Sequence, residues 1–206
     1  MIGGLTPADG GQIRLGADRL DGLSAHAIAR RGVGRTFQIP RPLGRMTVLE
    51  NVLVYAHDQP GERLARVFTT PKRVTAEENR VRERAQVILD SVELAHLAAA
   101  RAETLSGGQK KLLELARALM SNPRIILLDE PGAGVNPTLM RSLVDTIRAL
   151  RAAGRTFLLI EHDMDLVTEL CDPVIVMAQG RKLMEAPFAD VRRDPRVLEA
   201  YLGTAR

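Results

Sequence analysis

Two adjacent carboxylates, Asp129 and Glu130, follow the apolar residues 125–128. That apolar run predicts a buried strand, and open parallel sheets bind their ligands at the carboxyl ends of such strands. Because neighbouring residues on a strand point to opposite faces, we expect the two carboxylates to have different tasks. One can hold Mg²⁺ through water, and the other can orient or deprotonate an attacking water. The alternative interpretation is a strand that simply ends in a solvated turn.

A second candidate is the segment Leu-Ser-Gly-Gly-Gln at residues 105–109. Ser106 and Gln109 have the spacing of a capping box, in which the two side chains satisfy amides at a helix start. Such a helix start can bind a phosphate through its remaining amides and the positive end of the helix dipole. Taken alone, the segment favours an ordinary capping box.

His162 and Gln38 each follow a predicted strand. His162 comes after the second apolar run, residues 156–160, which predicts a second buried strand. A strand–helix–strand unit would place His162 beside Asp129 and Glu130. An imidazole there can donate a hydrogen bond to a γ-phosphate or to the attacking water. The amide of Gln38 could bind Mg²⁺ or water. Without its neighbours, His162 would be a capping or surface residue, and Gln38 alone carries no signal.

Local signals predict the elements that must position these residues. We expect Ser24 to start a helix that Gly32 ends, and Thr75 with Glu78 to form a capping box that starts another after irregular residues 58–74. Asn136 followed by a proline predicts an N-cap. The further predicted helices cover residues 47–55, 106–121 and 164–171, and the strands cover residues 12–15, 33–38, 125–128, 156–160, 173–177 and 181–185.

Composition narrows the class of protein. The chain has 206 residues, 45% hydrophobic and 26% charged, which is typical of one soluble globular domain or a domain with a lobe. Its formal charge is +4, but the basic residues are dispersed and aromatics are only 3%, unlike a nucleic-acid binder with stacking aromatics. No apolar run approaches the ~20 residues that span a bilayer, and the first residues lack signal-peptide features. We therefore expect a cytoplasmic protein.

Together these segments resemble the nucleotide-binding subunits of ABC transporters, because they occur in the order and with the spacing of that family's motifs. The resemblance extends over residues 1–206. The matching segments are residues 105–109 for the signature motif, 125–130 for the Walker B strand with its catalytic Glu, Gln38 for the Q-loop, 132–136 for the D-loop and His162 for the switch histidine. The D-loop position often carries Asp in the wider family and is Asn136 here.

The resemblance implies an α/β fold of the P-loop NTPase type, with a mostly parallel sheet as core and a helical lobe. On this interpretation residues 1–206 form a single, partial ABC-type ATPase domain. Residues 1–42 and 105–206 would be the core lobe, and residues 43–104 the helical lobe.

The family also implies a role for each residue. Two subunits form a head-to-tail dimer, with ATP between the phosphate loop of one and the signature helix of the other. Glu130 would be the general base, His162 would position the γ-phosphate and water, and Asp129 would hold Mg²⁺ through water. Gln38 would link Mg²⁺ to a transmembrane partner. The implied nucleotide-binding residues are Gln38, Ser106, Gly107, Gly108, Gln109 and Asn136.

A finer resemblance is to the ATP-binding subunits of branched-chain amino acid importers, carried by residues 32–38, 46–51, 160–164 and 201–203. It implies a peripheral protein on the cytoplasmic face of the inner membrane. The expected partners are a second ATP-binding subunit and transmembrane permease subunits, with no nucleic acid. ATP and Mg²⁺ are the expected cofactors.

One family motif is absent from these 206 residues: no G-x-x-x-x-G-K-[ST] string occurs. That loop's amides and Lys hold the β- and γ-phosphates, and its hydroxyl holds Mg²⁺. We expect the chain to begin after the loop and its helix, and to bind and hydrolyse ATP poorly. One alternative is a non-hydrolysing interaction module that supplies only its signature face. Another is a DNA- or ribosome-acting ABC ATPase, which the lack of heptads or tandem domains disfavours.

Overall fold

The computed structural model describes residues 1–36, 39–57, 59–62 and 64–202. Contacts between residues divide the chain into two units, Met1–Ile160 and Glu161–Arg206. Gln38, a predicted site residue, lies outside the described residues. The predicted division into a core lobe and a helical lobe stays a prediction.

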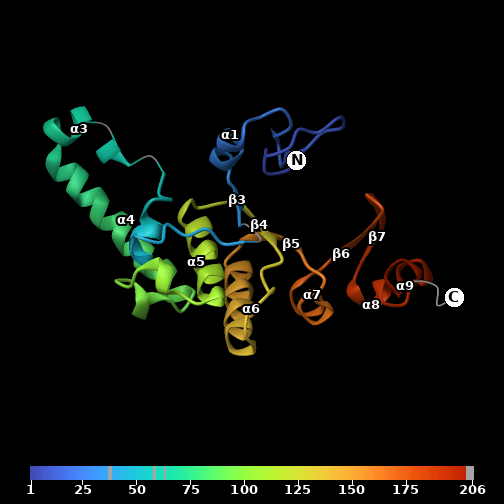
Figure 1. The fold of residues 1–206 in the computed structure, drawn as a ribbon. Coiled ribbons are helices and arrows are strands. Elements are labelled where there is room, and N and C mark those ends of the chain that lie inside the picture. Colours follow the sequence, from blue (N-terminus) through green and yellow to red (C-terminus); the bar gives the residue numbers. More distant parts are fainter. Residues whose placement is uncertain (37–38, 58, 63, 203–206) are drawn as a thin grey trace. The chain divides into compact units, whose positions relative to one another are not determined.

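A parallel sheet at the centre of the first unit carries the candidate site. Its strands are β3 (Val33–Arg35), β4 (Ile125–Asp129) and β5 (Thr156–Ile160), in the order β3-β4-β5 (Figure 1). Helix α6 (Pro137–Ala152) connects β4 to β5. The predicted strand–helix–strand unit is therefore confirmed, and its register pairs Asp129 with Ile160.

The two apolar strands differ in burial. On β4, Ile126 and Leu128 are almost fully buried, whereas Ile125 and Leu127 pack against an apolar cluster on the other face. On β5, the central residues are half-buried and Ile160 is 60% exposed. The prediction of a second buried strand is therefore wrong. β5 is an outer strand of this sheet and, unlike the other outer strand β3, is not fully covered by the described elements of its unit.

The N-terminal part of the first unit is a small hairpin followed by a helix. Strands β1 (Arg14–Leu15) and β2 (Asp18–Arg19) pair antiparallel. Helix α1 (Ala25–Arg30) begins after Ser24, whose Oγ accepts a hydrogen bond from the amide of Ala27. The predicted cap is confirmed, and Gly32 follows the helix with a left-handed φ of 91°.

Helices dominate residues 47–104. They are α2 (Val48–Leu53), η1 (Pro60–Glu62), α3 (Leu64–Thr69), α4 (Pro71–Ser91), η2 (Ala95–Leu97) and η3 (Ala102–Thr104). Two predictions are wrong here: residues 58–74 are largely helical, and α4 begins at Pro71 rather than at Thr75. Proline suits the first helical position, because its missing amide hydrogen has no helical partner there, so this start signal prevails over the later one.

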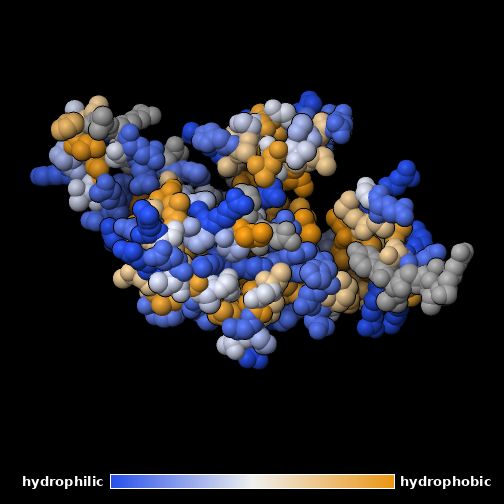
Figure 2. All heavy atoms as spheres, viewed as in Figure 1, coloured by the Kyte–Doolittle hydropathy of each residue, from blue (hydrophilic) through white to orange (hydrophobic). Residues whose placement is uncertain are grey.

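Helix α5 (Gly107–Met120) is the most completely covered element of the first unit. Residues 112–120 are all buried, and α2, α4, α6 and β3 contact the helix. It ends before Asn122, whose φ of 54° is left-handed. In contrast to the buried residues of α5, α3 exposes Val67 and Phe68, and Phe68 is 81% exposed. Figure 2 shows apolar surface at this helix.

The second unit is a hairpin with short helices. Its elements are α7 (Met164–Leu170), β6 (Val174–Ala178), β7 (Arg181–Ala186), α8 (Phe188–Val191) and α9 (Pro195–Leu202). Gln179 and Gly180 form the turn between β6 and β7, with left-handed φ values of 49° and 75°. In the described parts of both units, no helix is long and apolar enough to cross a membrane.

Candidate functional site

The carboxyl end of β4 presents Asp129 as its last residue. The Asp129 side chain is 32% exposed, and its Oδ2 lies 3.9 Å from Nη2 of Arg35 on the neighbouring strand β3. At that distance the pair is loose, so Asp129 keeps lone pairs available for water or a metal ion. Asp129 thus lies at the strand end, as predicted, and its role in holding Mg²⁺ stays a prediction.

Glu130 follows directly in a left-handed conformation, with a φ of 45°. Such a backbone is uncommon for a residue other than glycine and persists only where surrounding contacts hold it. The Glu130 amide donates to the carbonyl of Ile160 at 2.9 Å. Its carbonyl accepts from Nζ of Lys111 at 2.7 Å and from the amide of Ala133 at 3.2 Å. The backbone of the candidate general base is thus fixed at both polar groups.

An open cleft of about 580 Å³ adjoins Asp129. Its polar lining comes from Arg35, Arg41, Tyr55, Glu114, Arg117 and Asp129. The guanidinium groups outnumber the carboxylates, so the cleft favours an anionic ligand. A nucleotide phosphate is one such ligand.

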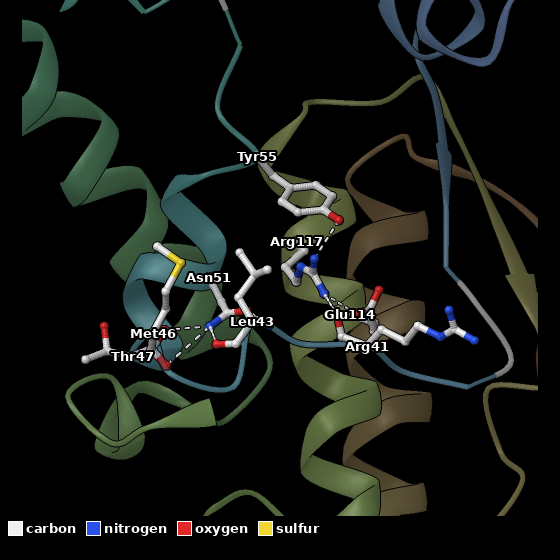
Figure 3. A network of polar contacts seen from close by, with 8 residues as sticks. All are labelled: Arg41, Leu43, Met46, Thr47, Asn51, Tyr55, Glu114 and Arg117. Carbon is white, nitrogen blue, oxygen red and sulfur yellow. Dashed lines mark hydrogen bonds and ion pairs between the residues drawn. The ribbon is translucent and has the colours of Figure 1, made fainter. Parts of the chain in front are cut away.

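Figure 3 shows the buried polar network on one side of this cleft. Arg117 donates to Tyr55 Oη at 2.7 Å and to the Arg41 carbonyl at 3.1 Å, and it forms an ion pair with Glu114. Its guanidinium also lies 4.4 Å from the centre of the Tyr55 ring. Burial raises the pKa of Glu114, while Arg117 and the Arg41 amide oppose that rise.

Asn51 on α2 completes the network and is fully buried. Its Oδ1 accepts from the Leu43 amide at 2.8 Å, and its Nδ2 donates to the Leu43 carbonyl at 3.1 Å and the Thr47 carbonyl at 2.9 Å (Figure 3). The segment 41–47 is therefore held from two helices.

The start of α5 has the predicted capping box. Ser106 Oγ accepts from the Gln109 amide at 3.3 Å, and Gln109 Oε1 accepts from the Ser106 amide at 2.9 Å. These two bonds leave the first-turn amides of Gly107 and Gly108 as the donors for an incoming anion.

The two glycines of this turn have different surroundings. A Cβ on Gly108 would lie 2.7 Å from Cδ1 of Leu139 on α6, so close packing explains that glycine. Around Gly107, apart from its chain neighbours and the backbone of its own helix, no heavy atom of the described residues lies within 4 Å of a Cβ position. The glycine at 107 therefore has no packing reason in this chain, which fits a position that another molecule approaches.

The remaining predicted residues are only partly placed. Asn136 is the predicted N-cap of α6, with Oδ1 accepting from the Leu139 amide at 2.9 Å. His162 belongs to the second unit, is 72% exposed, and has Nδ1 3.9 Å from Glu161 Oε2. Its predicted place beside Asp129 stays a prediction. Gln38 lies outside the described residues.

The donor set fits a water-held Mg²⁺ better than an enclosed metal. Among the described residues, no group of three or more His, Cys, Asp and Glu side chains could hold a metal ion. Mg²⁺ commonly uses one or two carboxylates, several waters and the phosphates of a nucleotide. A single accessible carboxylate, Asp129, is compatible with that arrangement.

Sequence reasoning missed Lys111, Arg35 and the Glu114–Arg117 pair. A signal for the pair existed, because two charges three residues apart interrupt the apolar run 112–120 of a helix that is otherwise buried. Nothing local distinguishes Lys111 from the adjacent Lys110. Its contact with Glu130 joins residues 19 apart in the chain.

A parallel sheet with carboxylates at a strand end, next to a capped helix start that presents free amides, defines an α/β domain of the P-loop NTPase type. A family model described as "ABC transporter" matches residues 1–133. The chain belongs to this family of ATP-binding transporter domains. A second model, described as "Branched-chain amino acid ATP-binding cassette transporter", matches residues 181–206.

Curated relatives are similar over nearly the whole chain. The probable branched-chain amino acid transport ATP-binding protein LivG of Archaeoglobus fulgidus is 41% identical over 202 residues, which is 98% of this chain and 77% of the relative. The high-affinity branched-chain amino acid transport ATP-binding protein BraF of Pseudomonas aeruginosa is 43% identical, over 95% of this chain and 77% of the relative.

Solved structures agree with the fold. A nucleotide-free ATP-binding cassette from an ABC transporter has a TM-score of 0.80 and 38% identity, covering 97% of this chain and 80% of that one. The ADP conformation of an ATP-binding cassette has a TM-score of 0.79 and 36% identity, covering 98% and 80%. The predicted family and fold class are confirmed.

Proposed function

We propose that this chain is an ATP-binding subunit that powers an ABC importer of branched-chain amino acids. The observation that carries the proposal is the identity of about 40% over nearly the whole chain to ATP-binding proteins of branched-chain amino acid transport. The match of residues 181–206 to a model of the same transporter type adds independent support.

In this proposal each candidate residue has a role. Glu130 is the general base for the attacking water, and Asp129 holds Mg²⁺ through water. His162 and Gln38 position the γ-phosphate, the water and the ion. The turn of α5 binds the γ-phosphate of an ATP carried by a second subunit, with Asn136 near the dimer contact. Its nucleotide-binding residues are Ser106, Gly107, Gly108 and Gln109. Bound Mg²⁺ would neutralise charge on the phosphates during transfer.

We further infer that this 206-residue chain alone binds ATP weakly, because it contains no G-x-x-x-x-G-K-[ST] string to cradle the phosphates. Calorimetric titration of the purified chain with ATP and Mg²⁺ tests this. We expect no saturation at micromolar nucleotide and no Mg²⁺-dependent phosphate release. Micromolar affinity with turnover would contradict the inference.

The importer role can be tested by uptake of radiolabelled leucine. A Pseudomonas aeruginosa strain lacking BraF would receive either this chain or a chimera. In the chimera, BraF's own residues upstream of the matched region precede this chain. We expect uptake with the chimera and not with the chain alone. A chimera that reaches the membrane and restores no uptake would contradict the importer role.

A second candidate function is an interaction module that supplies only the signature face to a partner. The intact capping box and the open position at Gly107 favour it. The test adds this chain to a BraF variant whose own signature turn has been inactivated. ATP turnover that appears on mixing, and that Gly107→Trp in this chain abolishes, would support the module.

We place the protein on the cytoplasmic face of the inner membrane, bound to permease subunits and to a second ATP-binding subunit. Support comes from the names of the relatives, which are ATP-binding proteins of branched-chain amino acid transport. Co-sedimentation of the chimera with membranes that contain or lack the permease genes tests it. Equal sedimentation with both membranes would contradict docking on a permease.

A further inference from the structure

Helix α5 holds two segments that are far apart in the sequence. Near its start, Nζ of Lys111 donates to the Glu130 carbonyl at 2.7 Å. Six residues beyond, Arg117, which is ion-paired with Glu114, donates to the Arg41 carbonyl at 3.1 Å. One helix therefore binds the backbone of the candidate base and the backbone of the segment that follows Gln38.

The hydrogen bond from Lys111 to the Glu130 carbonyl is charge-assisted, which makes it stronger than a hydrogen bond between neutral groups. It acts on a residue whose left-handed φ of 45° needs support. Lys110 has the same charge one position earlier, but successive helix residues point ~100° apart. The contact thus depends on the position of Lys111 and not on charge alone.

Residues 40–43 have few backbone donors, because Pro40 and Pro42 have no amide hydrogen. Arg117 binds the Arg41 carbonyl, and Asn51 binds both backbone polar groups of Leu43 (Figure 3). Side chains of α5 and α2 therefore hold the backbone of Arg41 and Leu43.

We propose that α5 is the common anchor of Glu130 and of the segment that begins at Arg41, with Lys111 and the Glu114–Arg117 pair as positioning residues. The proposal rests on the proposed function, in which the Ser106 turn at the start of α5 binds nucleotide. At a rise of ~1.5 Å per residue, Lys111 and Arg117 lie ~7 and ~16 Å along the axis from Ser106. If α5 shifts on nucleotide binding, its contacts with Glu130 and Arg41 move the backbone of both residues.

The first test measures amide hydrogen exchange of residues 129–136 by mass spectrometry in Lys111→Met. We expect exchange about tenfold faster than in the unchanged chain, because Glu130 loses one support. Lys110→Met is the matched control and should stay within about twofold. Lys111→Arg, which keeps a cationic donor, should restore protection. Equal exchange in Lys111→Met and Lys110→Met would overturn this hold.

The second test replaces the buried pair in Glu114→Leu/Arg117→Met, so that no charge is left unpaired. The amides of residues 39–47 should exchange about tenfold faster, while the urea midpoint stays close to that of the unchanged chain. The matched control is the exposed pair Glu77→Leu/Arg80→Met, which has the same residue types and spacing on α4.

Arg117→Lys keeps the charge beside Glu114 but has no planar fork to reach Tyr55 and Arg41 together. It provides the same measurement if the double variant does not fold. Unchanged exchange of residues 39–47 in Arg117→Lys and in the folded double variant would overturn the hold on Arg41. Both tests are made without nucleotide, so their outcome is separate from that of the ATP titration.

Discussion

The buried network around Arg117 and the carboxyl end of β4 use polar groups in opposite ways. In the network, side chains of α5 and α2 are buried and satisfy the backbone of residues 41–47. At the strand end, the backbone of Glu130 is held, whereas the Asp129 side chain stays accessible. The backbone is fixed in both regions, but the carboxylate is buried and ion-paired in the first and accessible and loosely paired in the second. The difference separates polar residues that build the fold from those that can do chemistry.

The largest expected effect comes from breaking the buried ion pair on one side. Arg117→Met leaves the Glu114 carboxylate buried without its partner, and we expect a loss of about 3–5 kcal/mol in the free energy of unfolding. Urea denaturation followed by circular dichroism measures it. The exposed control Arg80→Met should change the free energy by about 0.5 kcal/mol or less. Similar losses of unfolding free energy in Arg117→Met and Arg80→Met would show that burial of the ion pair does not set its contribution to stability.

Next in size is Asn51→Leu. It removes the fully buried side chain that binds the amide and the carbonyl of Leu43, so we expect a loss of about 2–3 kcal/mol. The same denaturation experiment applies. A matched substitution at the strand end, Asp129→Leu, should cost far less because that side chain is partly exposed and only loosely paired. A larger loss at Asp129 would contradict the comparison.

A smaller effect is expected at the helix start that both candidate functions use. Ser106→Ala removes the acceptor for the Gln109 amide and should cost about 1 kcal/mol. Ser106→Thr, which keeps a hydroxyl, should recover most of it. Thermal unfolding of the two variants and the unchanged chain gives the measurement. A cost equal in both variants would mean that the cap hydroxyl does not stabilise α5.

The raised pKa of Glu114 should be detectable in the pH dependence of the free energy of unfolding. Burial raises its pKa above the ordinary 4.5, so the folded chain takes up this proton at a higher pH than the unfolded chain. The unchanged chain should therefore gain stability relative to Glu114→Gln as pH falls through the folded pKa towards 4.5, with no further gain below it. Denaturation of both proteins across this window is the measurement, and a difference that is flat with pH would contradict the raised pKa.

The smallest effect concerns an exposed pair in the second unit. The hydrogen bond from Arg196 lowers the pKa of Asp194 from 3.8 to about 2. The stabilisation this pair gives is present above pH 3.8 and is lost as pH falls through about 2. In Arg196→Ala, NMR titration should show the Asp194 pKa returning towards 3.8. A pKa that stays near 2 would assign the shift to backbone amides instead.

Signals within a few residues predicted much of the fold. The caps at Ser24, Ser106 and Asn136 and the strand–helix–strand unit were predictable, because each depends on neighbours in the chain. The start of α4 was not, because Pro71 and the Thr75–Glu78 spacing are competing start signals of the same kind. β5 is less buried than predicted, because the residues of a strand do not determine which elements pack against it in the sheet.

For the candidate site, too, the residues with local sequence signals were predictable and those placed by long-range contacts were not. Asp129, Glu130 and the Ser106 turn could be predicted, since strand ends and helix starts have local signatures. The contacts of Arg117 with Tyr55 and Arg41 join residues 62 and 76 apart, and no local pattern encodes them. The left-handed backbone of Glu130 likewise depends on Lys111 and Ile160, which tertiary packing brings together.

Pro40, Pro42 and the bound amide of Leu43 have a consequence for association between chains. An added strand needs a row of free donors and acceptors, but the two prolines have no amide hydrogen and the Leu43 amide is bound to Asn51. Residues 40–43 are therefore a poor template for pairing with a strand of another molecule. The anchoring of the segment thus also guards this part of the chain against aggregation.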